Sequence, residues 1–214
     1  MYYYGGIWIL KAKITEAKIV ELLDWSYDKA INGLPGMETV EELAQNYLGK
    51  SRTVDEAIDK FIDWQTVKCA TSGFLTGLGG IITLPVAIPA NVGSVIYVQT
   101  RMVATIAYMK GYNIKDDQVR TFVYLALTGQ SSVDILKQFG IKAGIKFSEV
   151  LIKRIPTEII KQINKKVGFR LVTKFGEKGV INLGKCIPLL GGVIGGSVDF
   201  FGTQKIGKTA KKMF

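Results

Sequence analysis

The stretch CATSGFLTGLGGIITLPVAIPANVGSVIYVQT, residues 69–100, carries no charged side chain. A helix that crosses a bilayer needs about 20 apolar residues in a row. Pro85 and Pro89 interrupt this stretch, and a proline in a helix interior removes a hydrogen bond and clashes with the preceding turn. The adjacent glycines Gly79 and Gly80 favour a further bend. The stretch therefore predicts two apolar helical segments joined by a turn, and not one straight membrane-spanning helix.

Two arrangements of this hairpin stay open from the sequence. It can form the buried core of a helical bundle, or it can enter one leaflet or a bilayer from beneath sheltering amphipathic helices. Glycines four residues apart let helix backbones approach closely. Such pairs occur at Gly73 and Gly77, and again in a C-terminal apolar segment after Pro188, at Gly191 with Gly195 and Gly192 with Gly196. We expect the two segments to pack together.

Apolar side chains recur at helical spacing through the rest of the chain, and no segment of useful length alternates with the period of a strand. This pattern predicts an all-α protein: a single multi-helix bundle around a buried Gly/Pro-rich hydrophobic helical hairpin. Residues 1–34 are expected to contribute an N-terminal amphipathic helix, and residues 35–214 the remaining helical domain, as one structural unit.

Capping and turn signals divide the chain into helices. Thr39 precedes Glu42 at the spacing of a capping box, and Thr53 repeats the signal. Pro156 and Gly168 are predicted to break the basic C-terminal helices. The other predicted helices cover about 10–31, 39–48, 53–68, 101–110, 116–128 and 131–140, with a last helix that ends near 214.

The composition excludes several kinds of active site. The chain has 214 residues and no histidine, which rules out histidine triads, imidazole proton shuttles and histidine metal sites. Two cysteines do not make a disulfide framework, and no P-loop or nucleophile elbow occurs. Asp116 and Asp117 lie at a predicted helix start, where capping is the ordinary role. We expect no catalytic residue, metal or cofactor, with a paired-carboxylate hydrolase as the enzymatic alternative.

Positive charge is concentrated in the last third of the chain. The formal net charge is +10, and residues 133–214 hold 16 Lys and Arg against 5 Asp and Glu. An anionic bilayer attracts such a segment by about 1 kcal/mol per Lys or Arg near its surface, although a solvated lysine face is the simpler alternative. Nucleic acid is not an expected partner, because no aromatic-interleaved or zinc motif accompanies the charge. The residues predicted to face a membrane are Lys142, Lys146, Lys153, Arg154, Lys161, Lys165, Lys166, Arg170 and Lys174.

Two charged residues interrupt apolar helical runs, Arg101 and Asp199. A buried charge without a partner is very costly. The two residues therefore either form a buried ion pair, find other partners, or point to water.

A set of residues occurs in order along the chain as short motifs: Trp64, Gln65, Gly79, Gly80, Pro85, Pro89, Gln99, Arg101, Pro188, Gly191, Gly192, Gly195 and Gly196. Together these motifs resemble the EcsC family of bacterial proteins. The resemblance covers residues 35–214, while Asp199 departs from the small polar residue that the family pattern has after Ser197 and Val198. It implies a mainly helical protein at the membrane periphery, and it carries over no catalytic residues.

Composition and resemblance together predict a non-enzymatic, membrane-peripheral or lipid-binding helical protein. It is expected in the cytoplasm, at the inner face of the plasma membrane. The hairpin of residues 73–110 and the closing segment 187–210 would form a core that holds a lipid chain or opens onto a bilayer. Two alternatives are a protein-interaction module that regulates a transporter or secretion partner, and a membrane-permeabilising toxin.

Overall fold

The helical prediction is confirmed by a computed structural model. It describes residues 3–4, 7–8, 14–70, 88, 90–142, 146–175 and 191–214, with the backbone alone for 3–4, 7–8, 69–70, 90–91 and 191–201. A two-residue antiparallel pair is formed by β1 (Tyr3–Tyr4) and β2 (Ile7–Trp8). The helices are α1 (Glu16–Asn32), α2 (Val40–Leu48), α3 (Val54–Ala70), α5 (Ala90–Met109), α6 (Asp117–Ala126), α7 (Ser131–Gln138), α8 (Glu149–Lys153), α9 (Thr157–Phe175) and α11 (Gly191–Met213).

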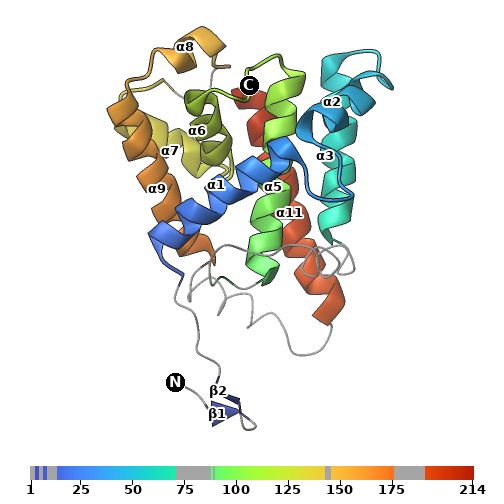
Figure 1. The fold of residues 1–214 in the computed structure, drawn as a ribbon, viewed down its shortest axis with the longest axis vertical. Coiled ribbons are helices and arrows are strands. Elements are labelled where there is room, and N and C mark those ends of the chain that lie inside the picture. Colours follow the sequence, from blue (N-terminus) through green and yellow to red (C-terminus); the bar gives the residue numbers. More distant parts are fainter. Residues whose placement is uncertain are drawn as a thin grey trace.

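The centre of the bundle is α5, around which the other helices are arranged (Figure 1). All its residues from 92 to 107 are buried, as expected for a helix with apolar side chains on all sides and few polar ones among them. In Figure 1, α1 crosses α5, α2 and α3 lie on one side, and α11 runs beside α5. The C-terminal arm of the predicted hairpin therefore lies in the core. Residues 73–87 and 89 of the hairpin, which include Gly79, Gly80, Pro85 and Pro89, lie outside the described residues.

The first helix of the bundle belongs to the same core. Ile19, Leu22 and Leu23 of α1 are buried in the cluster that contains most of the buried side chains of α5. On α9, Gly168 lies where α1 crosses: a Cβ atom there would be 3.0 Å from Cγ of Glu16. The predicted break at Gly168 is therefore wrong, because this glycine serves close helix packing and α9 continues through it to Phe175.

The capping signals give mixed outcomes. At Thr39 the capping box is confirmed, because its hydroxyl accepts from the Glu42 N–H at 3.2 Å and its own N–H donates to the Glu42 carboxylate at 2.8 Å. The hydrogen bond from the Thr39 backbone N–H is the main cause that lowers the pKa of Glu42. Asp116 occupies the N-cap of α6 but makes no capping hydrogen bond. Its carboxylate instead accepts from Asn113 at 3.0 Å and pairs with Lys153 at 2.9 Å.

Replacing the capping hydroxyl tests how much it stabilises α2. Thr39→Ala is expected to lower the free energy of unfolding by about 1 kcal/mol, because the Glu42 N–H loses its acceptor. Urea unfolding followed by circular dichroism measures the loss. Thr39→Ser keeps the hydroxyl and should retain most of the stability, so an equal loss in both variants would contradict the capping explanation.

Candidate functional site

The exposed side of α9 is strongly basic. The helix contains five basic residues and one acidic residue, Glu158. Its inner side packs into the core through residues spaced three and four apart, which is the pattern of an amphipathic helix: Ile160, Ile163, Val167 and Leu171. All five basic side chains are on exposed residues: Lys161, Lys165, Lys166, Arg170 and Lys174.

An aromatic side chain stands in the middle of this basic surface. Phe169 is 60% exposed. Lys165 and Lys166 lie one helical turn before it, and Arg170 follows it. We call Lys161, Lys165, Lys166 and Phe169 the α9 face. An apolar ring among cations on an amphipathic helix is the composition of surfaces that bind at a membrane interface.

The neighbouring α8 adds exposed apolar side chains. Val150 is 58% exposed and Leu151 is 46% exposed. Leu151 also lines an apolar groove of about 380 Å³ that extends to Pro156 and Ile159 at the start of α9. Two of the predicted membrane-facing residues, Lys142 and Arg154, line the same groove. Apolar and cationic groups therefore occur together around α8 as well as on α9.

The nine basic residues predicted to face a membrane are all exposed, but their surroundings differ. Lys153 forms ion pairs with Glu149 at 2.6 Å and with Asp116 at 2.9 Å. Hydrogen bonds to Glu149 and Asp116 raise the pKa of Lys153 to about 12. Its charge is balanced by carboxylates, so Lys153 contributes less positive potential than the lysines of the α9 face.

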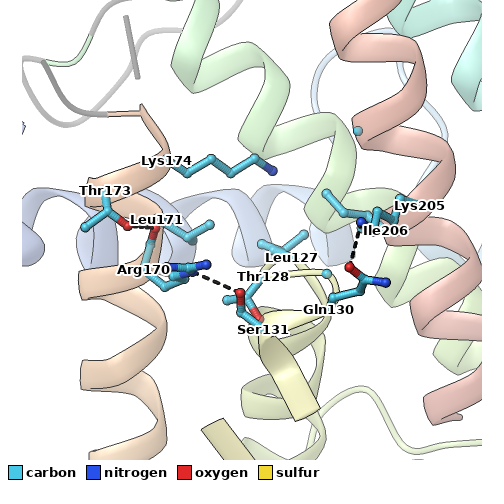
Figure 2. A pocket seen from close by; sticks show the side chains of 12 residues that line it. Leu127, Thr128, Gln130, Ser131, Arg170, Leu171, Thr173, Lys174, Lys205 and Ile206 are labelled. Carbon is cyan, nitrogen blue, oxygen red and sulfur yellow. Dashed lines mark hydrogen bonds between the residues drawn. The ribbon is translucent and has the colours of Figure 1, made fainter. Parts of the chain in front are cut away.

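A cavity of about 540 Å³ lies between α9 and α11 (Figure 2). Its base is the turn that joins α6 to α7, where Gly129 has a φ of 60° and reverses the chain. Figure 2 shows Arg170 and Lys174 on the α9 side and Lys205 on the α11 side. None of the described residues that line this cavity is acidic.

Neutral groups on the turn hold two of these cations. The Arg170 Nε–H donates to Oγ of Ser131 at 2.9 Å, and Lys205 Nζ donates to Oε1 of Gln130 at 3.0 Å (Figure 2). A second hollow of about 410 Å³ adjoins the first, since Gln130 and Lys205 line both. Its other cations are Lys208 and Lys212 of α11.

The sequence prediction did not include the α11 part of this basic region. Lys205, Lys208 and Lys212 lie three and four residues apart, so they share one side of the helix. That spacing is the signal that could have identified them. Their position opposite Arg170 depends on how α9 and α11 pack, which spacing alone does not determine.

The buried Arg101 has a main-chain partner. Its Nη2 donates to the carbonyl of Glu38, and 7% of the residue is exposed. Its Nε has no hydrogen-bond partner among the described residues, and burial lowers the pKa of Arg101. The side chain of Asp199 lies outside the described residues, so the ion pair with Arg101 stays a prediction.

The other family-like positions are divided between the core and the surface. Gln99 on α5 donates to Thr203 on α11 at 3.1 Å, which ties the two helices together inside the core. Gln65 is buried, whereas Trp64 is 51% exposed and has the Lys68 ammonium 5.3 Å from its ring centroid. Within the backbone of α11 lie Gly191, Gly192, Gly195 and Gly196, and Pro188 is outside the described residues.

Comparison with known protein families shows to which family this chain belongs. The model of the EcsC protein family matches residues 9–214. The protein belongs to the EcsC family. The match begins before residue 35, where the resemblance in the sequence begins, and it includes all of α1. No curated protein and no solved structure matches this EcsC-family chain significantly.

Within the described part of this EcsC-family protein, no helix is both long enough and apolar enough to cross a bilayer. Nor does that part contain a group of three or more Cys, Asp or Glu side chains placed to hold a metal ion.

Proposed function

We propose that this EcsC-family protein is a non-enzymatic, membrane-peripheral protein that binds anionic lipid surfaces through the α9 face. The observation that carries the proposal is the exposure of Phe169 one helical turn from the exposed Lys165 and Lys166. The anionic leaflet of a cell membrane faces the cytoplasm, so the proposed location is the inner face of the plasma membrane.

Electrostatic attraction and burial of apolar surface both favour membrane binding by the α9 face. Each lysine near an anionic bilayer contributes about 1 kcal/mol at low ionic strength, and the contribution falls as salt screens the charges. Burial of an exposed Phe side chain adds up to about 1.5–3 kcal/mol. Lysine stems also reach past the ring toward the headgroups while their methylene groups cover apolar surface. The charges therefore bring the helix to the membrane, and Phe169 anchors it there.

Reversal of charge on the α9 face tests the electrostatic contribution. Lys165→Glu with Lys166→Glu is expected to weaken binding to phosphatidylglycerol-containing vesicles at least about 30-fold, because two contacts of about 1 kcal/mol each are lost. Vesicle flotation at low salt measures the binding. The matched control is Lys50→Glu with Arg52→Glu, two exposed residues between α2 and α3 that change the net charge equally. If both double variants weaken vesicle binding equally, net charge explains the binding, and the α9 face is not the membrane-binding surface.

Removal of the aromatic ring tests the anchor. Phe169→Ser is expected to weaken vesicle binding about tenfold, and the loss should persist in high salt, because burial of apolar surface is not screened. The control is Trp64→Ser, which removes another exposed aromatic ring from α3, on the far side of the bundle from α9 (Figure 1). If Trp64→Ser weakens vesicle binding more than Phe169→Ser does, the membrane-binding surface would lie on α3 and not on α9.

The wild-type protein also distinguishes this function from the two alternatives. Absence of flotation with anionic vesicles at low salt would remove the proposal and favour a protein-interaction module. Release of an encapsulated dye on binding would indicate permeabilisation. We expect flotation without dye release, because a helix that lies in the interface does not cross the hydrocarbon core.

A further inference from the structure

We propose that the cavity between α9 and α11 is a binding site for a phosphate group, carried either by free phosphate or by a phosphomonoester lipid. This site is separate from the α9 face, and its test uses soluble ligands without vesicles. The cavity volume of about 540 Å³ is within the range of about 300–1,000 Å³ that is usual for small-molecule sites.

The charges around the cavity favour a doubly charged anion. Arg170, Lys174 and Lys205 line it from two helices, and no carboxylate lines it from the described part of the chain. In Figure 2 the Lys174 side chain extends from α9 toward α11. Arg170 and Lys205 approach the cavity from two helices and repel each other, so an anion placed between them relieves that repulsion. A phosphomonoester carries about −1.5 to −2 charges near pH 7, more than a carboxylate does.

The hydrogen-bond donors are arranged for an oxyanion. Ser131 accepts from the Nε–H of Arg170 and so fixes the guanidinium at the cavity wall. The Nη groups of Arg170 make no hydrogen bond to described residues. A guanidinium can use such groups for two parallel hydrogen bonds to a phosphate. Lys205 donates to Gln130 and, as an ammonium, has two further N–H donors.

The apolar part of the lining extends the ligand class beyond inorganic phosphate. Leu127, Leu171 and Ile206 line the same cavity as the three cations. A ligand that joins a phosphate to an apolar chain would use both parts of the wall, as small-molecule sites generally do when a few polar groups orient an apolar ligand. Lys208 and Lys212 in the adjoining hollow extend the positive potential and would steer an anion toward the site.

Calorimetric titration of the full chain tests the site. Inorganic phosphate, dihexanoyl phosphatidic acid and dihexanoyl phosphatidylcholine are titrated below their micellar concentrations at constant ionic strength. We expect saturable binding of the first two ligands and none of the third. Affinity for dihexanoyl phosphatidic acid at least tenfold above that for phosphate identifies a lipid phosphate, and equal affinity identifies free phosphate. Absence of saturable binding by both phosphate-bearing ligands would overturn the proposal.

Variants connect the binding to the cavity. Arg170→Gln and Lys205→Gln are each expected to weaken phosphate binding at least tenfold, and both residues are exposed, so neither change should unfold the protein. Arg154→Gln is the matched control, because Arg154 is an exposed arginine that does not line the cavity. Equal weakening by Arg154→Gln would overturn the assignment. Loss of phosphate binding in Lys205→Gln with unchanged vesicle flotation would separate this site from the α9 face.

Discussion

Phe214→Ala is expected to lower the free energy of unfolding by about 3–5 kcal/mol, one of the largest effects of a single substitution in this protein. The Phe214 side chain is fully buried. Its ring packs edge-on against Tyr112, with the centroids 5.0 Å apart. Truncation to Ala loses the transfer free energy of the ring and leaves a cavity that rigid neighbours cannot fill. Urea unfolding followed by circular dichroism measures the loss.

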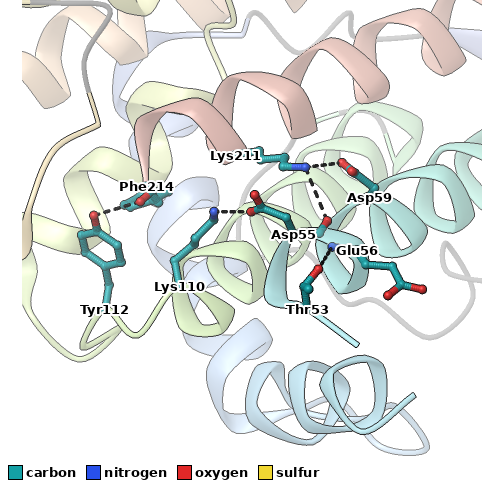
Figure 3. Close-up of polar contacts among 8 residues, drawn as sticks. All are labelled: Thr53, Asp55, Glu56, Asp59, Lys110, Tyr112, Lys211 and Phe214. Carbon is teal, nitrogen blue, oxygen red and sulfur yellow. Dashed lines mark hydrogen bonds and ion pairs between the residues drawn. The ribbon is translucent and has the colours of Figure 1, made fainter. Parts of the chain in front are cut away.

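The control for Phe214→Ala removes a polar group from the same contact. The Tyr112 hydroxyl lies between two main-chain oxygens. It contacts the carbonyl of Phe147, and it is 3.0 Å from the main-chain oxygen of Phe214 (Figure 3). Tyr112→Phe keeps the aromatic pair and leaves these buried oxygens without that donor, at a cost of about 1–3 kcal/mol. A smaller loss for Phe214→Ala than for Tyr112→Phe would show that polar contacts, and not packing, hold this end of α11 in place.

Two ion pairs lie near this end of α11, one from α11 to α3 and one from the end of α5 to α3, but they are expected to matter less. Lys211 pairs with Asp59 of α3 at 2.7 Å, and Lys110 pairs with Asp55 at 2.6 Å (Figure 3). The hydrogen bond from Lys110 is the main cause that lowers the pKa of Asp55. The carboxylates of both pairs are largely exposed, and such surface pairs contribute about 0–1 kcal/mol. Apolar packing therefore determines most of the stability at this end of the bundle.

Features that depend on neighbouring residues could be predicted from the sequence. The capping box at Thr39 needs only a hydroxyl and a carboxylate three residues apart, and the structure contains it. The uncharged segment after Pro89 predicted a buried helix, and residues 92–107 of α5 are all buried. In both cases the physical cause lies within one helix.

Features that depend on packing between distant segments could not be predicted in this way. Asp116 has the position of a cap, but Lys153 and Asn113 compete for its carboxylate. The cavity collects residues near 130, 170 and 205, whose positions become related only when α9 and α11 pack on the α6–α7 turn. The nine basic residues were identifiable by charge, whereas the anchoring role proposed for Phe169 depends on its exposure.

The role of a glycine is especially hard to predict from the sequence, because glycine occurs both in turns and at close contacts between helices. Gly207 lies in the interior of α11, where a Cβ atom would be 2.9 Å from both Cγ1 and Cγ2 of Ile62 on α3. Real Cβ contacts are rarely so short, and a β-branched side chain has few rotamers with which to give way. Gly202 lies five residues earlier in the same helix, and a Cβ atom there would meet nothing within 4 Å.

The two glycines therefore predict opposite results for the same substitution. Gly202→Ala is expected to raise the free energy of unfolding by up to about 1 kcal/mol, because alanine favours the helix and nothing obstructs it. Gly207→Ala should lower it by about 1–3 kcal/mol, because overpacking against Ile62 outweighs the gain in helix propensity. The expected difference is about 2–4 kcal/mol, measured by urea unfolding. Gly207→Ala combined with Ile62→Ala removes the clash and should behave differently from the sum of the single changes, since the two residues are in contact. Stabilisation by Gly207→Ala alone would show that α11 and α3 have room to separate, and would contradict the close packing that joins these helices.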